Sequence, residues 1–194
     1  SLTINTNSGG GGGSGGGGDG EAMVDWVLRA YESDATPPYP ALLVFGPFMQ
    51  QEKQLEFARR VSELKNVEAI TFEANIEPLI QGASGIVAMG GYNTFCEILA
   101  FDKPALIIPR TVPRKEQFIR AYRAQELGLV RMLEDDGIRN DRDMATALRH
   151  LPQQHRPSDI IVPGLLDGLP NVNRLARRLS GRNSGPLAAI ASQN

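Results

Sequence analysis

Short apolar runs alternate along this chain with stretches whose apolar residues recur at helical spacing. Short runs bounded by Gly, Pro or polar clusters are typical of strands, and recurrence every three to four residues is typical of amphipathic helices. The predicted strands are residues 2–4, 41–45, 67–72, 86–89, 103–110 and 130–133. The predicted helices are residues 21–32, 51–65, 76–81, a segment opened by Asn93 or Thr94, 113–127, 141–150 and 171–179. Asp19 and Asn140 or Asp141 are the predicted caps of two of them, and the proline-rich segment 152–170 is predicted to be irregular.

This alternation predicts the class of the fold. Strands that alternate with helices form a mostly parallel sheet with helices on both faces. We therefore expect an α/β protein with a single Rossmann-like domain, built on six strands. The domain is predicted to span residues 21–180 and to leave no room for a second domain of this kind.

The two ends of the chain have a different composition. Ten of the thirteen residues in 8–20 are glycine, more than a phosphate-binding loop needs. Residues 1–20 are therefore expected to form a short strand and a flexible glycine/serine loop, natural or inserted, and 9–18 to be mobile without ligand. Residues 181–194 are expected to be a flexible tail.

Composition and charge exclude several functions. The net charge of -2 gives no basic surface for nucleic acid, and no apolar run approaches the ~20 residues that span a bilayer. Cys96 is the only cysteine, so no disulfide forms within the chain, and a cytoplasmic protein is expected. His150 and His155 lie far from Cys96 in sequence, which argues against a metal site, and neither is expected to be catalytic. We expect Cys96 and Trp26 to be buried.

The segment 86–97 carries the first candidate chemistry. Its apolar strand ends at Gly90 and Gly91, and Tyr92, Asn93 and Thr94 then open a helix. Glycines allow close approach to the backbone, and the free N–H groups of a helix start attract anions. Glu97, one turn further, is placed to accept hydrogen bonds from a sugar diol. The same spacing also fits a capping box from Thr94 to Glu97, so this alternative stays open.

A second strand-to-helix connection carries basic and polar residues. The strand at 103–110 ends at Arg110, and Arg114, Glu116 and Gln117 follow at the start of the next helix. Ligands of open parallel sheets bind at the carboxyl ends of the strands. These side chains are therefore expected at the same edge as Gly90 and Gly91, although a solvated helix start would have the same composition.

Together these segments resemble a known family. The residues Met89-Gly90-Gly91-Tyr92-Asn93-Thr94, Glu97, Lys103-Pro104-Ala105, Pro109-Arg110, Arg114 and Glu116-Gln117 resemble the donor-binding, C-terminal half of a GT-B glycosyltransferase of the family 28 type. That group includes the N-acetylglucosaminyltransferase of the peptidoglycan precursor. The resemblance covers roughly residues 15–180, and its motifs are specific as a set.

The resemblance implies a role for each site residue. Gly90, Gly91, Tyr92, Asn93 and Thr94 would meet the diphosphate, and Glu97 the ribose. Gly17 and Gly18 would meet either the diphosphate or the acceptor side of the cleft. Arg110 and Arg114 would offset the charge of the leaving group, and Glu116 and Gln117 would meet hydroxyls of the donor sugar. No catalytic residue is assigned, because the N-terminal half commonly supplies the base in this family.

The resemblance further implies an inverting glycosyltransferase whose substrate is a nucleotide diphosphate sugar, with a UDP-sugar as first choice. It implies no cofactor and no metal. The acceptor-binding domain is expected to be a separate domain or subunit, so the isolated chain would be inactive, and any peripheral membrane contact would come through that missing half. A UDP-N-acetylglucosamine 2-epimerase-like isomerase and a non-catalytic nucleotide-binding module remain as alternatives.

Overall fold

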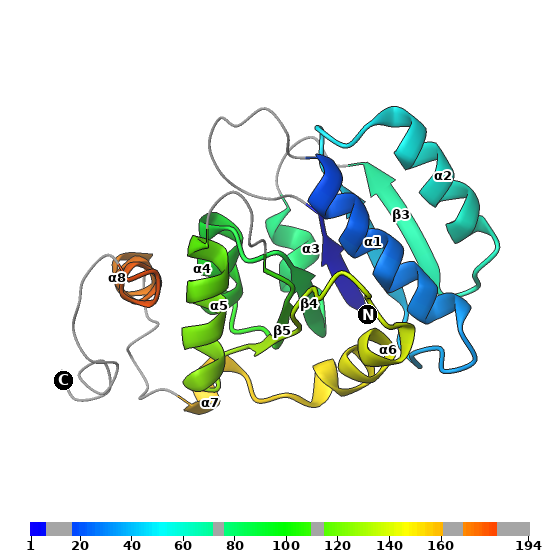
Figure 1. Cartoon of the computed structure of the whole chain (residues 1–194). Helices are drawn as coiled ribbons and strands as arrows, with labels where there is room; N and C mark the ends of the chain where they lie inside the picture. Colours follow the sequence, from blue (N-terminus) through cyan, green and yellow to red (C-terminus); the bar gives the residue numbers. More distant parts are fainter. Residues whose placement is uncertain (7–16, 72–75, 110–114, 161–168, 182–194) are drawn as a thin grey trace.

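The computed structural model describes residues 1–6, 17–71, 76–109, 115–160 and 169–181, and its strands form one parallel sheet. The strands are β1 (Leu2–Asn5), β2 (Ala41–Phe45), β3 (Val67–Thr71), β4 (Gly85–Ala88), β5 (Ala105–Ile107) and β6 (Arg131–Met132). Their order across the sheet is β3-β2-β1-β4-β5-β6, and every neighbouring pair is parallel (Figure 1). The predicted six-stranded α/β sheet is confirmed.

Helices cover both faces of this sheet, as predicted. The helices are α1 (Gly17–Glu32), α2 (Gln51–Ser62), α3 (Glu77–Gln81), α4 (Tyr92–Ala100), α5 (Glu116–Glu126), α6 (Asp141–His150), η1 (Leu151–Gln153), α7 (Pro157–Ile160) and α8 (Leu169–Leu179). On one face α1 packs between α2 and α6, and on the other α8 packs on α4 and α5 (Figure 1).

The alternation of side chains along the central strands builds two cores. In β4 and the residue after it, Val87 and Met89 join the core under α1, whereas Ile86 and Ala88 join the core under α4. This period of two is what a parallel strand with helices on both faces requires. Trp26 is 2% exposed in the first core and donates its indole N–H to the carbonyl of Asn140, so its predicted burial is confirmed.

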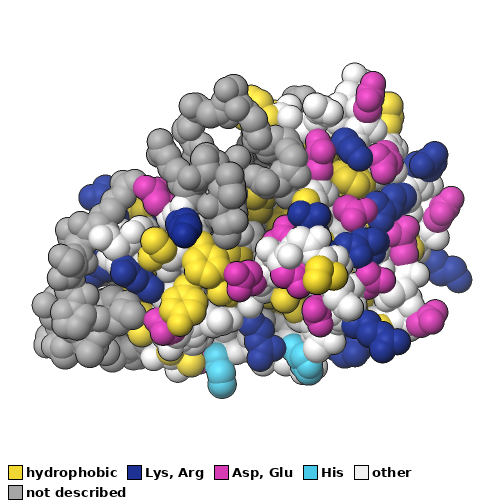
Figure 2. Space-filling view, viewed as in Figure 1, with side chains coloured by type: hydrophobic (Ala, Val, Ile, Leu, Met, Phe, Trp, Pro, Cys, Tyr) yellow, Lys and Arg dark blue, Asp and Glu magenta, His cyan; other side chains and the backbone are white. Residues whose placement is uncertain are grey.

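An ionic network joins three helices of the first face. Asp25 of α1 accepts from Arg60 of α2 at 2.7 Å and from Arg29 at 3.0 Å, and Arg29 also donates to Asp141 of α6 at 2.7 Å. Figure 2 shows acidic and basic side chains interspersed over this side of the molecule. Buried helix faces and interleaved surface charges therefore hold this layer together.

Two predicted features of the helices are wrong. Asp19 does not cap α1, because that helix already begins at Gly17. The segment 152–170 is not irregular throughout, since it contains most of η1, all of α7 and the start of α8. The short α7 follows Arg156, whose backbone N–H donates to Asp159, and Ser158 donates twice to the carboxylate of Asp102.

Candidate functional site

The candidate site lies at the middle of the sheet, where the strand order reverses. The chain proceeds from β1 outward to β3, then returns to place β4 on the other side of β1 and proceeds outward to β6. Open α/β sheets bind ligands outside the carboxyl ends of the strands at this point. Asn5 ends β1 and Gly90 lies just after the neighbouring strand β4, so the ends of these two strands lie side by side at this point.

The turn after β4 depends on glycine. Gly90 has φ +83°, in the left-handed region, and a Cβ placed on it would meet Cγ2 of Ile107 at 2.8 Å. Gly91 is the N-cap of α4 and offers no side-chain capping bond. The N–H groups at this helix start therefore have no intrahelical acceptor, and neither glycine carries a side chain that would keep an anion away from the backbone.

The start of α4 corrects two sequence-based interpretations. Asn93 and Thr94 are not the cap, because the helix already begins at Tyr92. Glu97 then stands at the sixth helical position instead of the third, so the capping-box interpretation is wrong. The helix therefore starts at the glycine turn and not at the capping residues Asn93 or Thr94.

Glu97 is a half-buried carboxyl group with capacity to accept. Burial is the main cause that raises its pKa above the ordinary value of 4.5, and the negative charge of Glu77 adds to this shift. Within the described part of the chain, no hydrogen bond or ion pair holds its carboxylate. A group in this state gains from a ligand that donates hydrogen bonds, as the two hydroxyls of a ribose would.

The three residues that open α4 have different surroundings. The Tyr92 hydroxyl contacts Asn173 of α8, with Oη 3.2 Å from Oδ1, so its side chain ties α4 to α8. Thr94 is buried, and its hydroxyl lies 3.5 Å from the amide nitrogen of Asn5, which donates to it. Asn93 is exposed. Any contact of Tyr92 with a phosphate is therefore expected from its backbone N–H.

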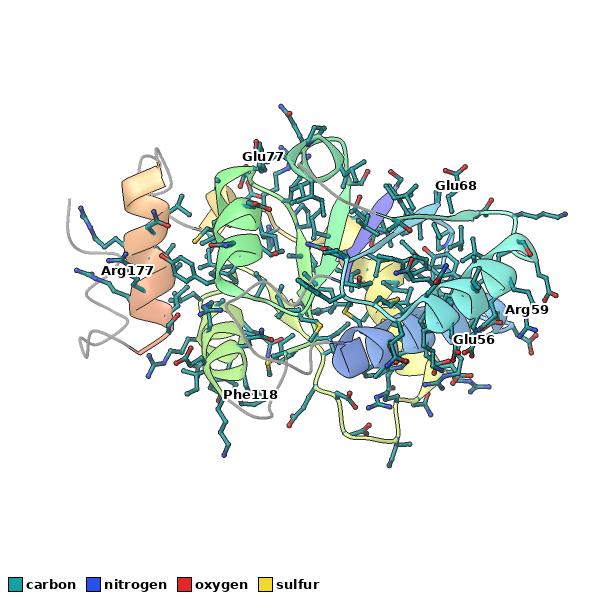
Figure 3. All side chains as sticks on the ribbon, turned by 90° about the horizontal axis from the view of Figure 1, so that it is seen from above. Glu56, Arg59, Glu68, Glu77, Phe118 and Arg177 are labelled. Carbon is teal, nitrogen blue, oxygen red and sulfur yellow. The ribbon has the colours of Figure 1, made fainter. Side chains whose placement is uncertain are left out.

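Other predicted site residues lie at neighbouring helix starts. Glu116 and Gln117 are the first two residues of α5, as expected. Figure 3, seen from above, shows Phe118 in this first turn of α5 and Glu77 at the start of α3. Gly17 and Gly18 open α1. Arg110, Arg114, Pro113 and most of the glycine tract, residues 7–16, lie outside the described residues, as does the tail 182–194.

Arg120 of α5, which no sequence pattern singled out, contacts the glycine turn. Its guanidinium donates to the carbonyl of Gly90 at 2.7 Å. The residue as a whole is 4% exposed. The available signal was a charged residue on the apolar stripe of a helix, since Ala121 and Ala124 are the other buried residues of α5. A buried arginine at such a position needs polar partners nearby.

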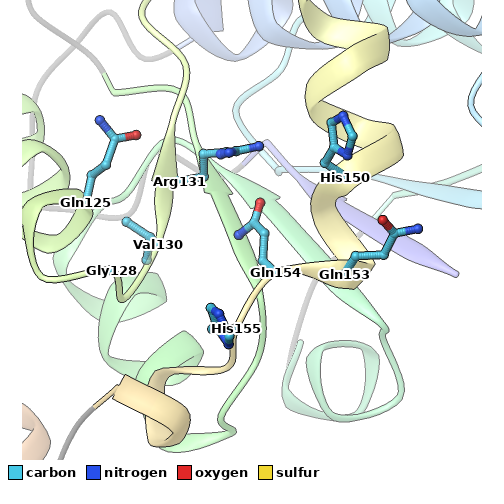
Figure 4. Close-up of a pocket in the computed structure, with 8 residues that line it drawn as sticks. All are labelled: Gln125, Gly128, Val130, Arg131, His150, Gln153, Gln154 and His155. Carbon is cyan, nitrogen blue, oxygen red and sulfur yellow. The ribbon is translucent and has the colours of Figure 1, made fainter.

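A hollow of about 590 Å³ lies at the opposite end of the sheet, near the amino ends of β5 and β6. Gln154 lies within it and donates to the carbonyl of Ala105, at the start of β5, while Arg131 begins β6 (Figure 4). His150 and His155 also line it, and both are exposed. The hollow therefore lies away from the turn after β4 and the start of α4. Among the described residues, no group of three or more His, Cys, Asp or Glu side chains is placed to hold a metal ion.

Comparison with known proteins agrees with this arrangement. Residues 15–156 match the glycosyltransferase family 28 C-terminal domain. The chain belongs to this family. No curated protein sequence matches the chain. The family 28 domain described here has, in the residues described, no helix that is both long and apolar enough to cross a membrane.

Solved structures share the fold of this family 28 domain at low sequence identity. The glycosyltransferase VinC in complex with dTDP is 16% identical, with a TM-score of 0.53 over 94% of this chain and 42% of that chain. MurG from Acinetobacter baumannii is 13% identical, with a TM-score of 0.54 over 91% of this chain and 49% of that chain. The UDP-GlcNAc 2-epimerase from Neisseria meningitidis, bound to UDP-GlcNAc, is 12% identical, with a TM-score of 0.50 over 94% of this chain and 44% of that chain. The chain thus spans less than half the length of these proteins.

Proposed function

We propose that this chain binds the nucleoside diphosphate part of a sugar donor for a glycosyltransferase. The proposal rests on the position and state of Glu97. This half-buried carboxyl group, whose pKa is raised, is the sixth residue of α4, the helix that follows the left-handed turn at Gly90. The turn follows β4, beside the point where the strand order reverses, and Glu97 belongs to the helix that begins there. A diphosphate suits the first and a ribose diol suits the second.

The diphosphate is proposed to lie at the N-terminus of α4. Backbone N–H groups from Gly91 to Thr94 are the donors, because the first turn of a helix has no acceptor for them. The helix dipole adds a partial positive charge there. Gly17 and Gly18, at the start of α1, would approach the same ligand from the neighbouring strand β1.

The sugar side of the donor is proposed to meet the segment before and at the start of α5. Arg110 and Arg114 would compensate the charge of the diphosphate leaving group, while Glu116 and Gln117 would bind sugar hydroxyls. A UDP-sugar is the first choice of donor. Direct displacement with inversion at the anomeric carbon needs no metal in this scheme, because helix N-termini and basic side chains stabilise the leaving group.

Transfer is proposed to require an acceptor-binding domain in the same or another chain. This chain spans 49% of MurG and 42% of VinC, and the remainder of such a protein would bind the acceptor and supply the base. The 194-residue chain alone is then expected to transfer no sugar. Any peripheral membrane contact would belong to the acceptor-binding half, and a cytoplasmic location fits a nucleotide-sugar substrate.

The fold alone does not separate transfer from epimerisation, because a UDP-GlcNAc 2-epimerase shares it. The match to family 28 favours transfer. A protein that contains this chain and its acceptor-binding partner would release nucleoside diphosphate from the donor only when an acceptor is present, whereas an epimerase would convert the sugar without one.

Calorimetric titration of the 194-residue chain with UDP and dTDP tests the proposal. At least one of the two should bind, and Glu97→Gln should weaken it several-fold because an amide accepts less well from the ribose hydroxyls than a carboxylate. Glu126→Gln is the matched control, since Glu126 is an exposed glutamate at the far end of α5. Equal affinity in the two variants would refute the assignment of Glu97.

A further inference from the structure

Arg120 is the one charged residue among the buried residues of the described part of the chain. It belongs to the second turn of α5 and is 4% exposed. Removing a charge from water is costly unless the group is paired and hydrogen-bonded. The partners of this guanidinium therefore indicate what its burial achieves.

Within the described part of the chain, its partners belong to residues 90–95 and to Ser180, both distant from Arg120 in sequence. Nη1 donates to the carbonyl oxygen of Gly90 at 2.7 Å, and Nε donates to the hydroxyl of Ser180 at 2.8 Å. The guanidinium carbon lies 5.5 Å from the ring centroid of Tyr92 and 6.0 Å from that of Phe95, on the first turn of α4. One side chain thus holds the glycine turn, the start of α4 and the end of α8 together.

The bond to Gly90 fixes the orientation of a peptide group. In a trans peptide the C=O and the following N–H point in opposite directions. Because the Gly90 carbonyl points toward Arg120, the N–H of Gly91 points away from α5. A peptide between two glycines rotates with little steric resistance, and the opposite orientation would turn a carbonyl oxygen toward an anion at the helix start.

We propose that Arg120 is a positioning residue that fixes the Gly90–Gly91 peptide so that the Gly91 N–H faces the diphosphate. This inference rests on the proposed function, and it goes further by assigning diphosphate affinity to a residue that does not touch the ligand. The fork shape of the guanidinium is essential, because separate N–H groups reach Gly90 and Ser180 at once.

Binding to the 194-residue chain tests the proposal, with UDP, dTDP and their nucleosides uridine and thymidine as probes. Arg120→Met should weaken the bound nucleoside diphosphate about tenfold or more, the effect of losing a charge-assisted hydrogen bond, and should leave nucleoside affinity unchanged. Arg123→Met is the matched control. Arg123 also joins α5 to α8, through the carbonyls of Arg178 and Leu179, but has no bond to the turn, so its variant should bind both probes normally.

Two further measurements keep the test decisive if Arg120→Met does not fold. Ser180→Ala removes the hydroxyl that accepts from Nε of Arg120 and should weaken the diphosphate, again without effect on the nucleoside. In Arg120→Lys the backbone ¹⁵N–¹H resonance of Gly91 should shift, because a single ammonium cannot hold both partners. That resonance is informative even without ligand.

The outcomes separate the two proposals. A native chain that binds neither UDP nor dTDP would refute the proposed function, and the Gly91 resonance would then decide the role of Arg120 alone. A native chain that binds, with unchanged diphosphate affinity in folded Arg120→Met, would overturn the role of Arg120 and leave the proposed function intact. An unshifted Gly91 resonance in Arg120→Lys, or an equal loss of nucleoside and diphosphate, would also overturn it.

Discussion

The negative charge of Glu77 acts on the carboxyl group of Glu97 from the neighbouring helix. Glu77 begins α3, Glu97 lies in α4, and the two helices pack together. Burial, and then repulsion by Glu77, raise the pKa of Glu97. A carboxyl group whose ionised form is disfavoured by burial and by a neighbouring negative charge is uncommon in a stable fold, and such groups gather at binding sites. We therefore expect the Glu97 carboxylate to lower the stability of the fold at neutral pH while it favours binding of a ligand.

Glu97→Gln should make the protein more stable at neutral pH. The folded chain keeps the Glu97 proton over a pH range in which the unfolded chain, with an ordinary pKa of 4.5, has already lost it. Stability then falls as pH rises through that range and stays lower above it. Removing the charge should raise the midpoint of thermal unfolding at pH 7 and change it little at pH 3. An unchanged or lower midpoint at pH 7 would argue against this assignment of the pKa shift.

Glu77→Gln should remove the repulsion between the two carboxylates while leaving the Glu97 side chain in place. Without the neighbouring charge the pKa of Glu97 should move toward its ordinary value, because burial then raises it alone. Titration of the Glu97 side chain by NMR in the two proteins measures this directly. A Glu97 pKa that does not fall in Glu77→Gln would contradict the coupling.

The sequence was sufficient where local signals decide the structure. Strand β2 occupies residues 41–45 as predicted, and α6 begins where Asn140 caps it, with the Asn140 side chain accepting from the N–H of Arg142 at 2.9 Å. The glycine turn between β4 and α4 was also predicted correctly. Apolar runs and caps are properties of neighbouring residues, so they are visible without the fold.

The sequence was insufficient where long-range contacts decide. Arg120 bonds Gly90, thirty residues away, and Ser180, sixty residues away, so nothing near it in the chain shows its role. The start of α4 was misjudged because Asn93 and Thr94 are strong capping residues, yet the turn at Gly90 already begins the helix at Tyr92. The short α7 was missed because Asp102, fifty-six residues from Ser158, provides its hydrogen bonds.

Asp25→Asn should destabilise the protein at neutral pH and have little effect in acid. Burial alone would raise the pKa of Asp25, but hydrogen bonds from Arg60 and Arg29 outweigh it and lower the pKa below 3.8. The stabilisation is therefore present above the unfolded pKa and is lost as pH falls through the folded value. Because the side chain of Asp25 is 43% exposed, we expect only about 0.5–1 kcal/mol at pH 7, measured by urea unfolding.

The ion pair between Lys53 and Glu56 provides the control for Asp25. It joins neighbouring turns of α2 only, and both side chains are about as exposed as Asp25. Glu56→Gln should therefore change the urea midpoint less than Asp25→Asn does. Equal effects would mean that bridging three helices adds nothing to a surface ion pair.

Gly90→Ala should destabilise the protein and impair the site at once. Gly90 and Gly137 share a φ of +83°, but a Cβ on Gly137 meets nothing within 4 Å, whereas one on Gly90 meets Cγ2 of Ile107 at 2.8 Å. The left-handed conformation alone costs about 1–2 kcal/mol for a residue with a Cβ. Gly137→Ala measures this backbone term, and Gly90→Ala should cost more because Ile107 is a fully buried residue of β5 that has little room to move. Urea unfolding of both variants gives the difference, and calorimetry with UDP or dTDP should show weaker binding only for Gly90→Ala. Equal destabilisation, with normal nucleotide affinity in both, would mean that the turn after β4 adapts to a side chain and that its glycine is not needed for close approach of a ligand.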